Sequence, residues 1–317
     1  MRQTATILTV GEILVEFVSH KKNCGLRDIS EYSGPYPSGA PAIFIDQASR
    51  MGAATEIVGG VGGDGFGVSV LERLKADGVG TRGVAVHPDR STGVAFVSYY
   101  NNGSRDFIFH ITNTASDHFD LQSNLVELEN TILHVSAASL GNEKMRATIM
   151  TMLRAVEAAG GKICCDPNAR SELMRDDAVR KALRETMDAS TYLMPSTSDL
   201  GFLFPDLSED AAVEQLLKAK AEIIVIKRGA QGATVVANGE RHEFTGHLVE
   251  EIDPTGAGDC FGGTFIALIA QGASLRTAGE TANAAGALAV TRRGPMEGNS
   301  SPSEIAKFIK HQNENVA

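Results

Sequence analysis

Residues 253–263 read DPTGAGDCFGG, a segment in which four glycines surround Asp259. Upstream, residues 248–252 (LVEEI) predict a short strand, and downstream the small and apolar residues 260–270 predict a buried helix. Glycine lets backbone N–H groups approach a ligand without a Cβ in the way. Because a helix start has unpaired N–H donors and a partial positive charge, the amides of residues 256–259 are candidates to hold a phosphate. The alternative is that Asp259 only caps the helix and the glycines only form a tight turn.

The composition and charge of the chain exclude several classes of protein. The 317 residues are 43% hydrophobic and 21% charged, which is ordinary for a globular protein with a sizeable core. No apolar run reaches the length of about 18 residues that a membrane span needs. The formal net charge of -10 and the absence of a basic stripe in the sequence argue against nucleic-acid binding. The sequence therefore favours small-molecule chemistry, with neither a nucleic acid nor a membrane as partner.

The N-terminal run and the cysteines predict a cytoplasmic protein. Residues 7–17 (ILTVGEILVEF) are interrupted by Glu12 and Glu16 and lack a small-residue cleavage site, so they predict a core strand rather than a signal peptide. The four cysteines show no Cys-x-x-Cys spacing, and Cys164 and Cys165 are adjacent within an apolar strand. We therefore expect reduced, buried thiols.

Strand and helix patterns alternate along most of the chain. The apolar run TEIVGG precedes the helical pattern FGVSVLERLKADG, and KICCD precedes DDAVRKALRETM. This alternation predicts an α/β fold, a three-layer sandwich with a mostly parallel central sheet and helices on both faces. No repeat, low-complexity tract or linker interrupts the sequence, so residues 1–317 are expected to form a single domain.

Two extended segments break this alternation. Within residues 91–112, STGVAFVSYY and RDFIFHIT alternate with period two around NNGS, which is a hairpin signal. Residues 13–36 also lack a helical period. Together the two segments predict a small antiparallel sheet that forms a lid over the site, with a surface hairpin of no function as the alternative.

Three short polar motifs follow predicted strands, and in open parallel sheets ligands gather outside the C-terminal strand ends. Residues 166–170 (DPNAR) offer an Asp, an Asn and an Arg to a polyhydroxy substrate or a phosphate, or else form an Asp-Pro turn. Residues 227–233 (KRGAQGA) offer a lysine and a glycine turn, which also fits an ordinary hairpin. In residues 194–199 (MPSTSD), Ser196 and Asp199 either face the ligand or only cap the helix that follows.

A different function is suggested by residues 60–65 (GVGGDG). This segment matches the G-x-G-x-x-G pattern of dinucleotide-binding sites, with Asp89 at about the right distance. Against this interpretation, Asp64 and Gly65 fall where the helix should begin, and the unit is not at the start of the chain. An NAD-dependent oxidoreductase is therefore the alternative from another class.

Several motifs together resemble one known family. DPTGAGDCFGGTF resembles the C-terminal signature of the ribokinase-like (PfkB) sugar kinases, and the resemblance extends over nearly the whole chain. The other motifs follow in the order and spacing of that family: GEILVEF, SGAPAIFIDQASRMG, VGGDGFG, STGVAFV, DPNAR, VIKRGAQGA and ANAAGALAVTRRG.

The resemblance implies an ATP-dependent kinase. In this reaction the γ-phosphoryl group moves to a primary hydroxyl of a small sugar, with Asp259 as the base. The backbone amides of Gly256, Ala257, Gly258 and Asp259 would stabilise the charge on the phosphoryl group, and Mg²⁺ would bridge the phosphates. A Cβ at Gly258 would intrude on this contact, and a positive φ is expected at that residue.

The resemblance also implies a set of further contacts, grouped here by ligand. The nucleotide and its metal would meet Lys227, Gly229, Gly232, Asn283, Ser196 and Asp199. The sugar would meet Glu16, Gly39, Ala40, Arg105, Asn168 and Arg170. Backbone oxygens of Asp253 and Thr255 would bind a monovalent cation such as K⁺.

The chain departs from the family pattern at several positions. Ile43 stands where the family usually has an asparagine that meets sugar hydroxyls, and Glu16 replaces the more frequent aspartate. The usual Asn-x-x-Glu motif becomes Ser196-x-x-Asp199, which puts its assistance to Mg²⁺ and phosphate in doubt.

The substrate is expected to be a ketohexose such as tagatose or fructose, because residues 34–52 most resemble a sub-group described as tagatose kinases. The alternative substrate is the sugar acid 2-keto-3-deoxygluconate, which Glu16 together with Arg105 and Arg170 would suit. The resemblance further implies a possible homodimer through the lid. A non-catalytic sugar sensor that kept the fold is the remaining alternative.

Overall fold

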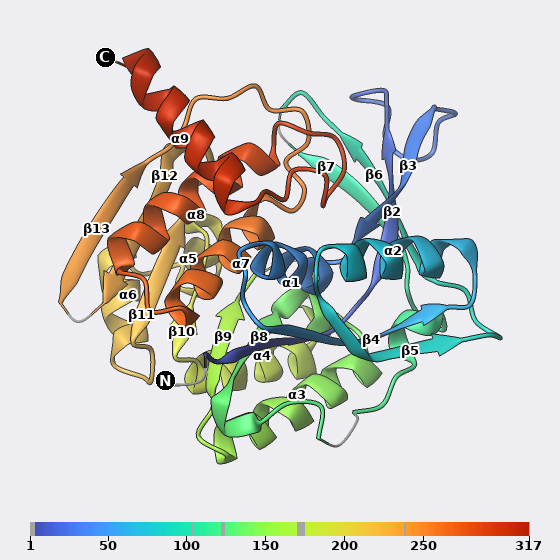
Figure 1. The fold of residues 1–317 in the computed structure, drawn as a ribbon, viewed down its shortest axis with the longest axis horizontal. Coiled ribbons are helices and arrows are strands. Elements are labelled where there is room, and N and C mark those ends of the chain that lie inside the picture. Colours follow the sequence, from blue (N-terminus) through green and yellow to red (C-terminus); the bar gives the residue numbers. More distant parts are fainter. Residues whose placement is uncertain (1–3, 103, 122–123, 170–174, 238, 317) are drawn as a thin grey trace.

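A computed structural model of the chain describes residues 4–102, 104–121, 124–169, 175–237 and 239–316. Within these residues, nine strands form a large sheet and four strands form a smaller sheet that projects from it (Figure 1). Helices cover both faces of the large sheet. This arrangement confirms the predicted α/β fold with a mostly parallel sheet and a separate β lid.

The large sheet is parallel except at one edge. In chain order its strands are β1 (Thr6–Val10), β4 (Thr55–Gly62), β5 (Gly80–His87), β8 (Thr131–Ser136), β9 (Lys162–Asp166), β10 (Tyr192–Leu193), β11 (Ile223–Lys227), β12 (Gly232–Ala237) and β13 (Glu240–Thr245). In space they follow the order β13-β12-β11-β10-β9-β8-β1-β4-β5. The pairings from β11 to β5 are parallel, whereas β12 and β13 are added as antiparallel hairpins. The C-terminal ends of the parallel strands therefore share one edge of the sheet.

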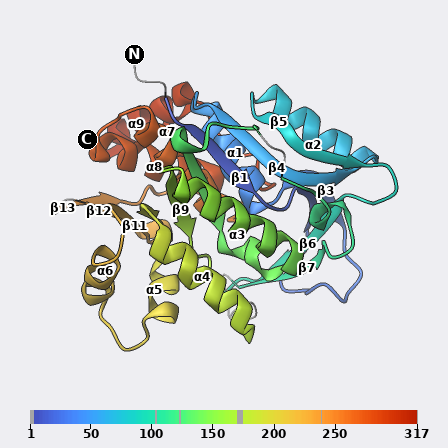
Figure 2. The same cartoon turned by 90° about the horizontal axis from the view of Figure 1, so that it is seen from below.

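The helices form two layers, one on each face of this sheet (Figure 2). Their bounds are α1 (Ala40–Arg50), α2 (Gly65–Ala76), α3 (Glu143–Ala158), α4 (Asp177–Ala189), α5 (Thr197–Leu203), α6 (Glu209–Leu217), α7 (Ala257–Ala270), α8 (Leu275–Ala289) and α9 (Pro302–Val316). One face carries α1, α2, α7, α8 and α9, and the other carries α3, α4, α5 and α6. The layers agree with the predicted sandwich.

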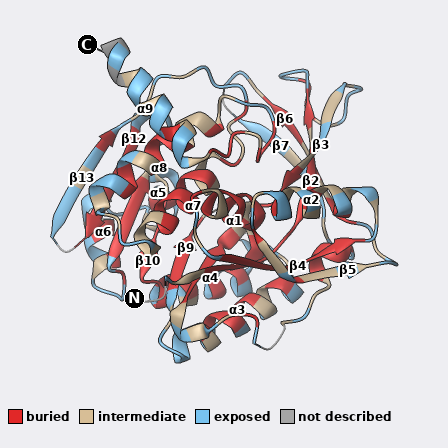
Figure 3. Cartoon of the chain, viewed as in Figure 1, coloured by how far each residue is buried: buried red, intermediate tan, exposed pale blue. Residues whose placement is uncertain are grey.

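Buried residues are concentrated in the strands of the large sheet and in the helices that cover it (Figure 3), and they form one core cluster on each face of the sheet. Successive residues of a strand point to opposite faces, so Ile7 packs with the α1 and α7 layer and Leu8 with the α3 and α4 layer. Cys164 likewise packs with the α1 and α7 layer, and Cys165 with the α3 and α4 layer. Together with Cys24 and Cys260 they are free, buried thiols, as the sequence predicts.

The lid is a four-stranded sheet in the order β3-β2-β6-β7. Its strands are β2 (Leu14–Ser19), β3 (Tyr32–Ser38), β6 (Gly93–Tyr99) and β7 (Arg105–His110). The β2–β3 and β6–β7 pairs are antiparallel, whereas β2 and β6 run parallel. The parallel pair arises because β2 follows β1 and β6 follows β5, and β1 and β5 already run in the same direction in the large sheet.

The segment between β13 and α7 differs from its prediction. Residues 248–252 were expected to form a strand, but the structure has no strand there, and Leu248 is almost fully exposed. The chain leaves β13 at the edge of the sheet, and residues 248–252 run mostly exposed toward α7, so a strand there would have no buried face. The helix predicted over residues 260–270 is present and begins earlier, at Ala257.

Candidate active site

Strands β9 and β11 flank β10, and each places a charged side chain at its C-terminal end. Lys227 Nζ donates a hydrogen bond to Asp166 Oδ2, and the two side chains are only 14% and 5% exposed. Burial alone would lower the pKa of the amine, but the carboxylates of Asp166, Asp199 and Asp259 raise it above its usual value. The lysine therefore remains a cation at the predicted ligand edge.

The sequence raised Asp166 as a candidate within its motif but did not predict its pairing with Lys227. Asp166 opens the DPNAR motif, from which only Asn168 and Arg170 were selected as contacts. The backbone N–H of Asn168 donates to Asp166 Oδ1 at 3.2 Å, so this carboxylate holds both the lysine and the turn after β9. Its position at the last residue of a buried strand was the signal that could have identified it as a contact.

Glycine is required at the start of α7, at a different position from the one predicted. Gly256 is the N-cap with φ of 82°, and a Cβ there would lie 2.4 Å from the carbonyl oxygen of Pro295. Gly258 lies inside the helix and has no positive φ, so that prediction is wrong. The reason is that the helix begins three residues before Cys260, which places the left-handed turn at Gly256.

The first turn of α7 consists of Ala257, Gly258 and Asp259. The first amides of a helix have no partner within it and carry partial positive charge. A Cβ on Gly258 would lie 3.5 Å from Lys227 Nζ, and Asp259 is close enough to this amine to interact electrostatically with it. Since the N-cap is Gly256, the alternative that Asp259 is only the N-cap is wrong. The structure thus brings a carboxylate, a cation and a helix N-terminus together.

Ser196 and Asp199 form the capping box of α5. Ser196 Oγ accepts from the Asp199 amide at 3.1 Å, and Asp199 Oδ2 accepts from the Ser196 amide at 2.7 Å. The other carboxylate oxygen, Oδ1, accepts from the Ala169 amide at 2.7 Å. The pair therefore caps the helix, as the alternative interpretation held, and Asp199 also fixes the turn that follows Asp166.

The residues predicted for the nucleotide lie around the β11–β13 hairpins. Gly229 and Gly232 have φ of 55° and 101°, and a Cβ on Gly232 would lie 1.9 Å from the carbonyl oxygen of Phe244. Asn283 of α8 donates to the carbonyl oxygen of Thr245 at 2.8 Å. Gly232 and Asn283 therefore meet at the end of β13, while Lys227 ends the neighbouring β11.

Three of the predicted sugar contacts lie together where the lid meets α1. Glu16 of β2 is buried, and Ser38 Oγ donates to its Oε2 at 3.2 Å. Gly39, with φ of 109°, is the N-cap of α1, and a Cβ there would lie 2.4 Å from the carbonyl oxygen of Glu12. Ala40 is the first residue of the helix.

Of the two predicted arginine contacts, the structure describes only Arg105. Arg105 is exposed on β7, the outer strand of the lid, with its guanidinium carbon 5.4 Å from the centroid of the Phe107 ring. Arg170 lies outside the described residues.

Ile43, which replaces the usual asparagine of the family, is buried under the start of α7. Its Cγ2 would lie 3.2 Å from a Cβ on Gly256. Its carbonyl oxygen accepts from Asn299 Nδ2 at 3.1 Å. The position therefore supports the glycine turn through an apolar contact and offers no side-chain polar group to a sugar.

The predicted cation loop is held by a buried carboxylate. Asp253 is fully buried, and it accepts from the amides of Thr255 at 3.0 Å and Gly294 at 2.9 Å. The hydroxyl of Tyr99, from the lid strand β6, donates to Asp253 Oδ1 and lies 2.6 Å from Thr255 Oγ1. The sequence gave no reason to single out Tyr99.

The glycines of the G-x-G-x-x-G match pack against the chain itself. A Cβ on Gly60 would lie 2.1 Å from the carbonyl oxygen of Ala115, so the space next to it is occupied by backbone. Asp64 caps α2 by accepting from the amide of Gly67 at 2.9 Å, and it also accepts from the Thr92 amide at 2.8 Å. The segment serves as the turn that joins β4, α2 and the start of β6.

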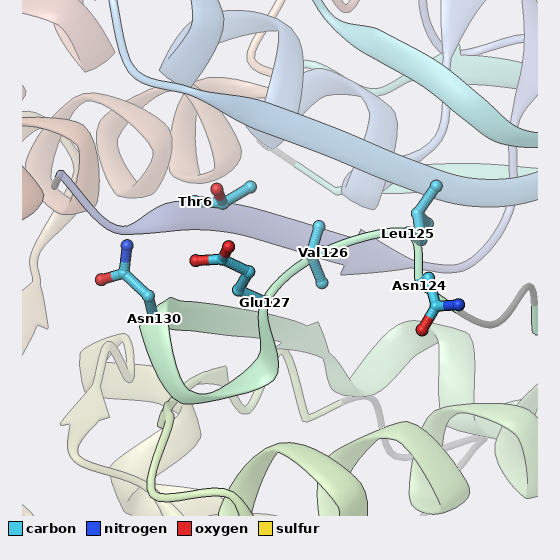
Figure 4. A pocket seen from close by; sticks show the side chains of 6 residues that line it. All are labelled: Thr6, Asn124, Leu125, Val126, Glu127 and Asn130. Carbon is cyan, nitrogen blue, oxygen red and sulfur yellow. The ribbon is translucent and has the colours of Figure 1, made fainter.

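A surface hollow of about 430 Å³ lies at the opposite edge of the large sheet (Figure 4). It is lined by Thr6, Asn124, Leu125, Val126, Glu127 and Asn130. Thr6 begins β1, so this hollow is at the N-terminal ends of the strands and separate from the cluster around Asp259.

Comparison with known proteins identifies the family. The pfkB family carbohydrate kinases match residues 5–302 of the chain. The chain belongs to this family. An Escherichia coli protein described as a "putative Ribokinase II" is 41% identical over 97% of this kinase and 99% of that protein, with a TM-score of 0.91. A second structure of that protein, in complex with ATP and Mg²⁺, has a TM-score of 0.90.

Fructokinases are also similar to this kinase. The fructokinase of Vibrio alginolyticus is 29% identical over 86% of this chain and 91% of its own length. Fructokinase-1 of Oryza sativa subsp. japonica is likewise 29% identical, over 96% of this chain and 97% of its own length. The family confirms the predicted enzyme, an ATP-dependent sugar kinase, and excludes the oxidoreductase. Among the described residues, no helix has the length and apolar character of a membrane span.

Proposed function

We propose that this kinase phosphorylates a primary hydroxyl of a ketohexose such as fructose or tagatose. Two of the relatives above are named as fructokinases, whereas the Escherichia coli protein is described as a ribokinase. The observation that carries the proposal is the buried carboxylate of Glu16 in the lid, next to Gly39 and Ala40. A buried carboxylate accepts hydrogen bonds from sugar hydroxyls.

The sugar-acid alternative needs a cation beside the sugar. Arg105, one of the two candidates, lies over Phe107 on the outer lid strand, exposed to solvent. An exposed guanidinium gives little net attraction to a carboxylate because water screens the charge. Asn168 lies two residues after Asp166, at the C-terminal end of β9, and has a φ of 34°. We propose it as a neutral contact to the sugar. We therefore favour the neutral ketohexose over a sugar acid held by Arg105.

The chemistry follows from the cluster at the start of α7. The sugar hydroxyl attacks the γ-phosphorus in line, the bond between that phosphorus and the departing ADP oxygen breaks, and the hydroxyl proton passes to Asp259. The amides of Ala257, Gly258 and Asp259 donate to the oxygens of the transferred group. Lys227 adds a positive charge 3.5 Å from the Cβ position of Gly258. Asp166 keeps that amine in place and charged.

The charge balance of the cluster suits a nucleotide with a divalent cation. Three carboxylates, those of Asp166, Asp199 and Asp259, surround the single ammonium of Lys227. Mg²⁺ supplies charge neutralisation between the phosphate groups, keeps several waters, and needs only one or two protein carboxylates. We propose that Asp166 and Asp199 attract it through water. The adenosine end would extend along Gly229, Gly232 and Asn283.

A K⁺ site at Asp253 and Thr255 also remains a proposal. The side chain of Asp253 is occupied by the amides of Thr255 and Gly294 and by Tyr99, which holds the loop in one conformation. Backbone oxygens of such a fixed loop are suitable ligands for a monovalent cation. Removing K⁺ at constant ionic strength tests this proposal through the turnover rate.

We also propose an oligomeric state and a location for the enzyme. The exposed Ile108 and Phe109 on the edge strand β7 fit a homodimer formed through the lid. Free, buried cysteines fit a cytoplasmic location, where thiols stay reduced. We also propose that residues 1–317 act as one kinase domain that includes the lid.

A coupled ADP-release assay tests the substrate. We expect turnover with fructose or tagatose, and a kcat/KM for 2-keto-3-deoxygluconate at least about tenfold lower, which corresponds to about 1.4 kcal/mol. A preference of the same size for the sugar acid would overturn the ketohexose proposal. Sugar and ATP binding without turnover would instead support the non-catalytic sensor.

A further inference from the structure

Tyr99 connects the lid to the loop that precedes α7. Tyr99 is the last residue of β6, and its side chain is buried. Its hydroxyl donates to Asp253 Oδ1 and lies 2.6 Å from Thr255 Oγ1.

Asp253 in turn fixes the backbone that starts α7. Its carboxylate accepts from the amides of Thr255 at 3.0 Å and Gly294 at 2.9 Å. Gly294 precedes Pro295, whose carbonyl oxygen lies 2.4 Å from the Cβ position of Gly256. A displacement of the carboxylate would therefore move the two chain segments that shape the turn before Asp259.

A second lid strand contacts the same segment. A Cβ on Gly294 would lie 2.7 Å from Cδ1 of Tyr36, which belongs to β3. Glu16, the proposed sugar contact on β2, pairs in register with Ala95 of β6. A sugar held by Glu16 is thus one strand away from the tyrosine that holds Asp253.

We propose that Tyr99 is a positioning residue that couples sugar binding at the lid to the phosphate-binding turn before α7. The inference rests on the proposed function, because it takes the lid as the sugar side and α7 as the phosphate side. Sugar that fixes β6 also fixes Tyr99, Asp253 and the Gly256 turn, so the bound sugar raises the affinity for ATP. The reciprocal effect, ATP raising the affinity for sugar, has the same size.

The test compares two tyrosine variants with wild type. Tyr99→Phe removes the hydroxyl that reaches Asp253, whereas Tyr100→Phe removes a neighbouring hydroxyl that donates to Asp106 Oδ2 at 2.6 Å on the exposed lid edge. The affinity for a non-hydrolysable ATP analogue is measured by calorimetry with and without the better of fructose and tagatose. In wild type and Tyr100→Phe the sugar should tighten the analogue by about fivefold or more, the lower range for coupled sites.

In Tyr99→Phe the analogue should bind with nearly the same affinity whether or not the sugar is present. A merely structural role would lower stability and activity and leave this ratio unchanged. If wild type turns over a ketohexose and Tyr99→Phe retains the ratio of Tyr100→Phe, the inference is wrong and the proposed function stands. If wild type turns over neither sugar, the proposed function fails and the inference fails with it.

A measurement on wild type keeps the inference testable if Tyr99→Phe does not fold. Hydrogen exchange is followed in the peptide covering residues 290–297, which includes the amide of Gly294 and contains no proposed sugar contact. Sugar alone should slow exchange in this peptide. Unchanged exchange at saturating sugar would overturn the inference.

Discussion

The pair formed by Lys227 and Asp166 allows the structural and chemical contributions of one lysine to be separated. The three variants are Lys227→Met, Asp166→Asn and the double variant. The ion pair has side chains that are 14% and 5% exposed, so solvent screens it weakly. Removing one partner of a buried pair typically destabilises a protein by about 3–5 kcal/mol, and we expect about 3 kcal/mol here because the lysine is not fully enclosed.

The double variant should regain part of this loss. With both charges removed, no unpaired ion is left in the interior. The double variant should therefore lose about 2 kcal/mol less stability than the sum of the two single losses. Urea unfolding of the four proteins measures this difference. Lys162→Met is the matched control, because Lys162 pairs with Glu222 at 3.4 Å on the surface, where the side chains are 47% and 60% exposed. That change should cost no more than about 1 kcal/mol.

Activity should not follow stability in the double variant. If Lys227 stabilises the charge of the transferred phosphoryl group, its removal should lower kcat/KM for ATP by about 10² or more, as the loss of one preorganised donor does. The double variant should therefore be more stable than either single variant and remain nearly inactive. Strictly additive losses of stability, or a double variant with wild-type kcat/KM, would refute the reasoning.

Three further predictions concern single residues. Gly258→Ala should leave the melting temperature unchanged or slightly higher, because Gly258 is helical, and turnover should fall because the added Cβ meets the phosphate. Gly256→Ala should instead lower the free energy of unfolding by more than about 1 kcal/mol, because Gly256 has a left-handed φ. Normal turnover in Gly258→Ala would show that this glycine serves only the fold. His134 is fully buried and stacked on Phe44, and burial lowers its pKa to about 3. The unfolded chain therefore binds a proton at this residue more readily than the folded protein. The free energy of unfolding should be unaffected above pH 6.5 and should fall as the pH drops from 6.5 toward 3. Urea midpoints should give a loss of about 2 kcal/mol between pH 7 and pH 5 that His134→Leu lacks, and equal pH dependence of the two proteins would contradict this. Arg105→Ala should change kcat/KM for fructose by less than about threefold, as expected for an exposed side chain, and a steep loss confined to 2-keto-3-deoxygluconate would point to the sugar acid.

Hydrophobic periodicity predicts those strands and helices whose buried residues recur at regular spacing along the sequence. The strand KICCD and the small, apolar helix after Asp259 are both present, since each has the pattern of a buried strand or helix. Periodicity fails for residues 248–252, because this segment lies mostly exposed between β13 and α7 and has no buried face. It also cannot set the exact start of a helix, which is why the positive φ was expected at Gly258 and occurs at Gly256.

The sequence could predict those candidate site residues that belong to single local motifs. Lys227 and Asp259 stand at a strand end and a helix start, where ligands gather, and the family resemblance assigned their roles. The pairing of Lys227 with Asp166 depends on the order β9-β10-β11, which no local pattern contains. The bond from Tyr99 to Asp253 joins residues 154 positions apart and depends on where the lid lies. Such contacts become visible only in the folded chain.

The central claim is that Asp259 accepts the proton of the sugar hydroxyl, and Asp259→Asn tests it most directly. The amide keeps the shape of the side chain and cannot take up the proton, so turnover should fall by about 10² or more while ATP binding and the melting temperature stay close to wild type. Asp188→Asn, an exposed aspartate on α4, is the matched control and should keep full activity. Steady-state turnover of Asp259→Asn within a few-fold of wild type would contradict the assignment of Asp259 as the base.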